Sequence, residues 1–362
     1  MFKRDVSSAL PRMLGRMDGR KSPVWGLTES GRRLTLDFIS VNLTLGSVVS
    51  FDRNFMTRIR GRILMAIEKI TPELVHVVSL DQEIEELATG FGGDAGPAEG
   101  PLWWQEDGYL LFSDIGNNRR MKWSPNEGVS LVVQPSNYAN GLTRDLQGRL
   151  IACEHETRRV VRYELDGSLT VVASNHRGTR LNRPNDVIVK SDGCLYFTDP
   201  GGPGPDVDLD FAGVYRVTPD LGTMTLLIGD FVTPNGLAFS PDESILYIND
   251  TRRQHIRAFD MQPNGMLALA SDRVFRDLSG ARPGVPDGMK VDVEGNVYCG
   301  GSGGIWVMDK TGRHLGIVAH GEGATTNVAF GGDDWKTLYF TTWNTLGRIQ
   351  LNIPGLPVPT GA

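Results

Sequence analysis

One sequence pattern recurs six times along this chain. The stretch "NRPNDVIVKSDGCLYFTDP", residues 182–200, contains a polar pair, a short apolar strand, an acidic or glycine turn, and a second apolar strand. The same order appears in five other segments. The leading polar residues of the six units are Glu99, Asn140, Asn185, Asn235, Asp287 and Asn327, and consecutive members are 40 to 52 residues apart. This period is typical of a propeller blade, so we predict an all-β fold, a six-bladed β-propeller with four-stranded blades.

Segments with alternating apolar and polar residues follow each unit and supply the outer strands of the blades. We expect the propeller to span residues 85–352, preceded by a connecting segment at 65–84 and followed by a C-terminal tail at 353–362. The ring of blades must also close. Either residues 83–91 or residues 346–353 can complete the shared blade and leave no long exposed edge.

The first 64 residues differ from the rest of the chain in charge. They hold 12 Lys and Arg against 5 Asp and Glu, and they lie outside the repeat. We interpret residues 1–64 as a basic leader, either loosely ordered or the product of an over-long start, that is dispensable for the fold. A tail that binds anionic surfaces is the alternative.

Composition narrows the class of protein. The 44 glycines and 20 prolines in a chain that is 40% hydrophobic favour many turns between short strands. A net charge of −6 argues against a nucleic-acid partner, and no apolar run indicates a membrane span. Cys153, Cys194 and Cys299 form no pair motif, so a reducing cytoplasm is the expected location.

The repeat gives its polar residues a shared location. The first strand of each propeller blade lines the central channel, so the six leading residues should converge on one axis. Glu99 and Asp287 would repel each other there unless a cation lay between them. Carboxylate and amide oxygens suit Ca²⁺, Mg²⁺ or Mn²⁺, and the histidines show no spacing typical of zinc. The alternative is that these side chains only cap strand ends or hold channel water.

Four of the motifs together resemble one known family. "NRPNDVIVKSDGCLYFTDP", "TPNGLAFSPDESILYIND", "VPDGMKVDVEGNVY" and "NVAFGGDDWKTLYFT" are similar to segments of the senescence-marker-protein/gluconolactonase/luciferin-regenerating family of six-bladed propellers. The likeness covers roughly residues 85–352. It implies one divalent cation, Ca²⁺ in the first place with Mg²⁺, Mn²⁺ or Zn²⁺ as alternatives.

The resemblance also implies roles for individual residues. The metal ligands would be Glu99, Asn235 and Asp287, with Asn185 as a fourth position that contacts metal or substrate. Asp287 would also act as the general base. Substrate-binding roles would fall to Arg183, Asn185 and Asn140. His155 is a further substrate-binding candidate, because it ends the second strand of the unit that begins at Asn140; a surface or structural histidine is the alternative.

The implied reaction is metal-assisted hydrolysis of a lactone to its hydroxy acid, as in gluconolactonases. The cation would polarise the carbonyl oxygen and Asp287 would take a proton from the attacking water. Two alternatives stay open: hydrolysis of other esters such as phosphotriesters, and a non-catalytic binding propeller. The partner would be a small lactone or ester, and the oligomeric state is not predicted. Trp343 is expected in the core rather than in a wall of the site.

Overall fold

The computed structural model describes residues 26–29, 32–35, 65–201, 208–321 and 323–359. The chain divides into two units, Met1–Ile59 and Arg60–Ala362. In the first unit, strands β1 (Gly26–Glu29) and β2 (Arg32–Thr35) pair antiparallel. The rest of the predicted leader lies outside the described residues.

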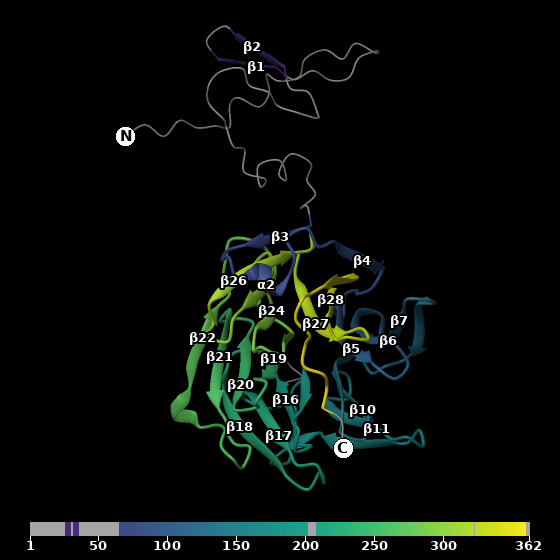
Figure 1. Ribbon diagram of the computed structural model, residues 1–362. Helices are drawn as coiled ribbons and strands as arrows, with labels where there is room; N and C mark the ends of the chain where they lie inside the picture. The colour runs from purple at the N-terminus through teal and green to yellow at the C-terminus, as the bar shows by residue number, and fades with distance from the viewer. Residues whose placement is uncertain (1–25, 30–31, 36–64, 202–207, 322, 360–362) are drawn as a thin grey trace. The chain divides into compact units, whose positions relative to one another are not determined.

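The second unit is a six-bladed β-propeller (Figure 1), which confirms the predicted fold class. The first blade consists of β5 (Ala98–Trp104), β6 (Tyr109–Asp114), β7 (Arg119–Ser124) and β8 (Gly128–Val133). The second consists of β9 (Ala139–Arg144), β10 (Leu150–Glu154), β11 (Arg159–Tyr163) and β12 (Leu169–Ala173). The third consists of β15 (Val187–Val189), β16 (Leu195–Asp199), β17 (Ala212–Val217) and β18 (Met224–Phe231). The fourth and fifth are β19 (Pro234–Phe239), β20 (Ile245–Asp250), β21 (His255–Asp260) and β22 (Arg273–Asp277); and β23 (Met289–Val291), β24 (Val297–Gly301), β25 (Gly304–Met308) and β26 (His314–Ala319). The sixth is β27 (Thr325–Gly331), β28 (Thr337–Thr342), β29 (Thr345–Gln350) and β4 (Ile84–Thr89). A two-stranded hairpin, β13 (Asn175–His176) and β14 (Thr179–Arg180), precedes the third blade.

Both candidate segments take part in closing the ring. β29 is the third strand of the sixth blade, and β4 pairs with it antiparallel as the outermost strand. The innermost strands contact one another around the whole circle, including β27 with β5. The predicted connecting segment also joins the body of the propeller, because β3 (Ala66–Lys69) adds a fifth strand beside β26.

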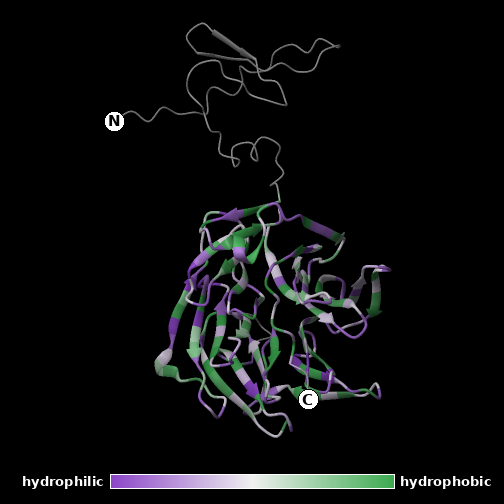
Figure 2. Ribbon diagram, viewed as in Figure 1, coloured by the Kyte–Doolittle hydropathy of each residue, from purple (hydrophilic) through white to green (hydrophobic). Residues whose placement is uncertain are grey.

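The core is divided into six apolar clusters, one between each pair of neighbouring blades. Successive side chains of a strand point to opposite faces, so one strand can contribute side chains to two clusters. On β16, Leu195 and Phe197 pack toward the second blade while Tyr196 packs toward the fourth. Hydrophobic and hydrophilic residues accordingly intermix along the strands in Figure 2. The alternation read from the sequence therefore builds the contacts between blades.

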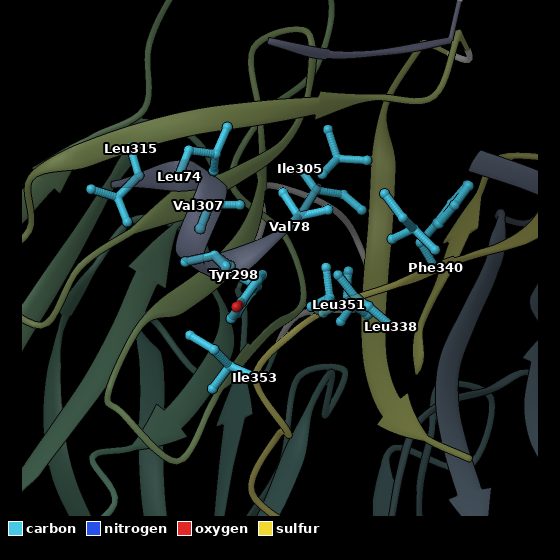
Figure 3. Packing of buried hydrophobic residues seen from close by; sticks show 14 of the residues in the cluster. Leu74, Val78, Tyr298, Ile305, Val307, Leu315, Leu338, Phe340, Leu351 and Ile353 are labelled. Carbon is cyan, nitrogen blue, oxygen red and sulfur yellow. The ribbon is translucent and has the colours of Figure 1, made fainter. Parts of the chain in front are cut away.

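The cluster between the fifth and sixth blades also gathers segments from both ends of the propeller (Figure 3). Leu74 and Val78 come from the short helix α2 (Leu74–Val77) and its C-terminal end. Leu351 and Ile353 follow the last strand, and all four side chains are buried. These segments fasten the start and the end of the propeller to the same core.

The described part of the C-terminal tail continues along one end of the central channel. The Leu356 backbone N–H donates to the Val291 carbonyl at 3.1 Å, and Gly355 forms a bridge with Asp292. Leu356 and Val358 pack against the core clusters of other blades. The tail therefore covers that end of the channel with apolar side chains.

The three cysteines are free and buried. Among the described residues, none of the helices has the length and apolar character needed to cross a membrane.

Gly355→Ala should destabilise the propeller. A Cβ atom at Gly355 would overlap the Phe330 ring, and neither neighbour can move without disturbing the inner strands. Overpacking of this kind costs about 1–3 kcal/mol, so the midpoint of urea unfolding should fall. Gly323→Ala is the matched control, because a Cβ there meets open space. An equal midpoint for the two variants would contradict the tight contact at Gly355.

Candidate active site

The six leading polar residues of the repeat lie at equivalent places in the blades. Four of them are on the innermost strands: Glu99 on β5, Asn140 on β9, Asn235 on β19 and Asn327 on β27. The other two, Asn185 and Asp287, lie two residues before β15 and β23. Because these strands contact one another around the circle, the six residues form a ring at one end of the channel. We call this set the polar ring.

Glycine follows four members of the polar ring, for a steric reason. Any Cβ on Gly100 would collide with the Asn140 carbonyl oxygen of the next blade, and one on Gly236 with that of Asp287. A Cβ on Gly288 would overlap the Asn327 side chain. The Asn-Gly and Asp-Gly pairs of the sequence therefore allow neighbouring inner strands to approach closely.

The third blade differs, because its ring member Asn185 is followed by Asp186 instead of glycine. Asp186 is 2% exposed, and its Oδ1 accepts the backbone N–H of Val187 at 2.9 Å. A Cβ on Gly141 would be 2.7 Å from Asp186 Oδ1, so this carboxyl lies against the innermost strand of the second blade. Its charge raises the pKa of both Glu99 and Asp287. The sequence analysis assigns no role to Asp186, although this residue stands out as the acidic one where four other units have glycine.

Three carboxyl groups thus lie at the polar ring: Glu99 and Asp287, which are members of it, and Asp186, which lies beside it. Burial raises the pKa of Glu99 to about 8, with a further increase from the charge of Asp186. Burial also raises the pKa of Asp287 well above its ordinary value, and the charges of Glu99 and Asp186 add to that effect. The pKa of Asp186 is raised by burial as well. Buried like charges this close are unfavourable without a compensating cation.

Glu99 and Asn327 are buried and hydrogen-bonded to each other. Glu99 Oε2 accepts the Gly100 N–H at 2.8 Å and the Asn327 Nδ2 amide at 3.0 Å. Asn327 Oδ1 is occupied by the Val328 N–H at 2.8 Å. Asn327 therefore orients Glu99, and both described bonds end on Oε2, which leaves Glu99 Oε1 as the oxygen suited to a further ligand.

Other ring oxygens are buried without a hydrogen-bond partner among the described residues. They are Asn235 Oδ1, Asp287 Oδ1, Asp186 Oδ2 and Asn140 Oδ1. Such atoms are rare in native proteins and indicate a missing ion or water. Carboxylate and amide oxygens are hard donors that suit Ca²⁺ or Mg²⁺. The residues Glu99, Asn235 and Asp287 therefore fit a divalent cation chemically. In the part of the chain that the structure describes, no three His, Cys, Asp or Glu side chains are grouped to hold an ion, so such a site depends on the asparagine as well.

The predicted substrate residues lie on the same side of the ring. Asn140 Nδ2 is 3.3 Å from His155 Nε2. Burial, and to a smaller extent the charge of Arg183, lowers the pKa of His155 to about 3. The imidazole of His155 is therefore neutral, and its Nε2 can accept a hydrogen bond from the Asn140 amide. Arg183 is exposed at the mouth, on a backbone held in place by Asp199, whose Oδ1 accepts the Arg183 N–H at 2.7 Å.

The sequence interpretation was wrong for Trp343. Its side chain is 57% exposed rather than buried in the core. Its backbone carbonyl accepts the N–H of Ala98, the residue before Glu99, at 3.1 Å. Trp343 therefore offers an exposed aromatic surface close to the polar ring.

The stability of the metal-free protein should depend on pH through Glu99. Its pKa is 4.5 in the unfolded chain and about 8 in the fold, so between these values only the folded chain keeps the proton. Raising the pH across this window should therefore lower the free energy of unfolding. Urea unfolding in the presence of a chelator measures this slope. Glu99→Gln cannot ionise and should give a smaller slope, and an unchanged slope would rule out the raised pKa.

Comparison with known proteins agrees with this architecture. Residues 97–344 match the family model described as the SMP-30/Gluconolactonase/LRE-like region. A gluconolactonase of Zymomonas mobilis is 30% identical over 315 residues, covering 80% of this chain and 87% of that protein. Pentonolactonase XacC of Haloferax volcanii is 30% identical over 250 residues, covering 67% of this chain and 80% of that protein.

A solved structure of a gluconolactonase from Xanthomonas campestris is also similar. It superimposes with a TM-score of 0.71 at 31% identity, covering 80% of this chain and 96% of that one. The family model alone spans well over half of the chain, and the structure closes the six blades that the motifs predict. The chain belongs to the SMP-30/gluconolactonase/LRE-like family.

Proposed function

We propose that this protein is a divalent-metal-dependent lactonase that opens a sugar lactone to its hydroxy acid. The observation that carries the proposal is the group of buried oxygens at the polar ring that have no hydrogen-bond partner among the described residues: Asp287 Oδ1, Asp186 Oδ2, Asn235 Oδ1 and Asn140 Oδ1. The buried carboxyl group of Glu99 lies with them. The relatives of similar length that are described as a gluconolactonase and a pentonolactonase support the same substrate class.

Glu99, Asn235 and Asp287 would hold the cation, with Asn185 at a fourth position beside them. The donors are kept in place by the protein: Asn327 orients Glu99, and Thr251 Oγ1 accepts the Asn235 Nδ2 amide at 3.2 Å. When bound, a divalent cation supplies Lewis-acid polarisation of an ester carbonyl. Ca²⁺ suits this all-oxygen set best, with Mg²⁺, Mn²⁺ and Zn²⁺ as the alternatives.

Asp287 would act as the general base. Its Oδ1 has no hydrogen-bond partner among the described residues, so this oxygen is available to take a proton from an attacking water. The Asp287 backbone is held to the preceding blade, because its carbonyl accepts the Nδ2 amide of Asn249 on β20. A fixed carboxylate at the channel mouth can therefore meet a water at one face of a bound lactone.

The other edge of the ring would bind the substrate. Asn140 and neutral His155 present amide and imidazole groups that exchange hydrogen bonds with sugar hydroxyls. Arg183 would contribute a cationic donor from the exposed mouth, and the exposed Trp343 ring would give an apolar wall for the C–H face of the lactone. This division would put the metal donors and the substrate donors on adjacent arcs of one ring.

Acid release from a panel of sugar lactones and phosphotriesters, with chelator and then with each cation in turn, tests the function. Lactone hydrolysis that disappears with chelator and returns with a divalent cation is the expected result. Preferential turnover of phosphotriesters would favour the alternative hydrolase. Absence of turnover on the whole panel at saturating cation would contradict an enzymatic role and favour a binding propeller.

Asp287→Asn separates the base from the ligand, because it keeps an oxygen and the shape but removes the proton acceptor. At saturating cation its kcat should remain about 10²–10⁴-fold below that of the unaltered protein. Asn235→Ala is the control, since it removes a neutral ligand oxygen and added cation should restore most of its rate. Full recovery of Asp287→Asn by added cation would show that Asp287 serves only as a ligand.

A further inference from the structure

A cavity of about 190 Å³ lies in the channel beneath the polar ring. Its wall contains the residues three positions beyond each ring member along the chain, which are Leu102, Thr143, Ile188, Ala238, Lys290 and Phe330. The tail residues Leu356 and Val358 line it from the other end. Five of these six wall residues are uncharged, so this part of the cavity is mainly apolar. The sixth, Lys290, brings an ammonium group.

Lys290 is placed to act on the ring at a distance. It lies on β23, three residues after Asp287, and its Nζ donates to the Met289 carbonyl at 3.1 Å. It forms no ion pair with any described carboxylate, whereas Glu243, which also lines the cavity, pairs with Lys190 Nζ at 2.8 Å. Among the described residues, its ammonium group is therefore a charge of the cavity wall that no carboxylate pairs locally.

The charges of the ring region balance only when Lys290 is included. Glu99 on β5, Asp186 before β15 and Asp287 before β23 bring three negative charges when ionised. One divalent cation offsets two of them, and Lys290 offsets the third. Because net charge is costly in a buried site, this arrangement suits a cation of charge two.

We propose that Lys290 is a fixed counter-charge beneath the polar ring that selects a divalent over a trivalent cation. Lys290 is thus a specificity-determining residue for the metal and does not touch the substrate. The inference rests on the proposed function, because it requires a cation in the ring. Its physical basis is that repulsion from the ammonium grows with the charge of the bound ion.

Calorimetric titration of the full chain with Ca²⁺ and with Tb³⁺ measures the affinity for each cation and tests the inference without measuring turnover. Lys290→Met removes the charge and keeps an unbranched side chain that an apolar cavity accepts. The ratio of Tb³⁺ affinity to Ca²⁺ affinity should rise on the order of tenfold in this variant, since one unit charge acts across a partly buried distance. Lys290→Gln gives a second readout if the methionine variant folds poorly.

Two further variants sharpen the result. Lys310→Met removes an exposed lysine that does not line the cavity, so its affinity ratio should equal that of the unaltered protein. Asp186→Asn combined with Lys290→Met removes one charge of each sign and should bring the ratio back toward the original value.

The outcomes separate the inference from the function on which it rests. An unaltered protein that binds neither cation would overturn the proposed metal site and this inference together. Binding of Ca²⁺ by all variants with the same affinity ratio in Lys290→Met as in the unaltered protein would overturn the inference alone.

Discussion

The close approach of six inner strands around one axis is the constraint on which the rest of this structure depends. Closing six blades into a ring brings the backbone of each inner strand against its neighbour, and glycine at Gly100, Gly236 and Gly288 provides the space. The residue before each of these glycines then has to face the channel. Polar side chains that are far apart in the sequence are brought together by this packing alone.

The same closeness produces the chemistry of the ring. Carboxyl groups from three different blades are buried together, and burial with mutual repulsion raises the pKa of Glu99 to about 8. A protein gains no stability from such a cluster, so its cost points to a task that needs it. In the function proposed above, a divalent cation with Lys290 beneath it would relieve the repulsion and make this set of acids a preorganised site for ester hydrolysis.

Much of the fold could be predicted from the sequence because each repeat encodes one blade. The alternating apolar residues predicted strands with two packed faces, and the structure confirms six blades and the family. The closing strand could not be chosen, since residues 83–91 and 346–353 both have strand patterns and the structure pairs them with each other. The C-terminal tail reads as an irregular proline-rich end, and only the structure shows that Leu356 and Val358 cover the channel.

The candidate site was less predictable, because its electrostatics depend on neighbours from other blades. Asp186 reads as half of a turn pair, and its charge acts on Glu99 of the first blade and Asp287 of the fifth only because all six blades close around one axis. Lys290 reads as the polar residue of an alternating strand, and only the structure shows that it lines a mainly apolar cavity in the channel. Trp343 was misjudged because a large aromatic residue after a strand is usually buried, whereas this one lies at the ring mouth.

Anomalous X-ray scattering from crystals grown with Mn²⁺ tests the central claim most directly, because it locates the cation without reference to activity. The account predicts one strong peak within about 2.0–2.6 Å of oxygens from Glu99, Asn235 and Asp287, the distance range of oxygen ligands to such cations. A peak bound elsewhere, or an empty ring at saturating Mn²⁺, would contradict it.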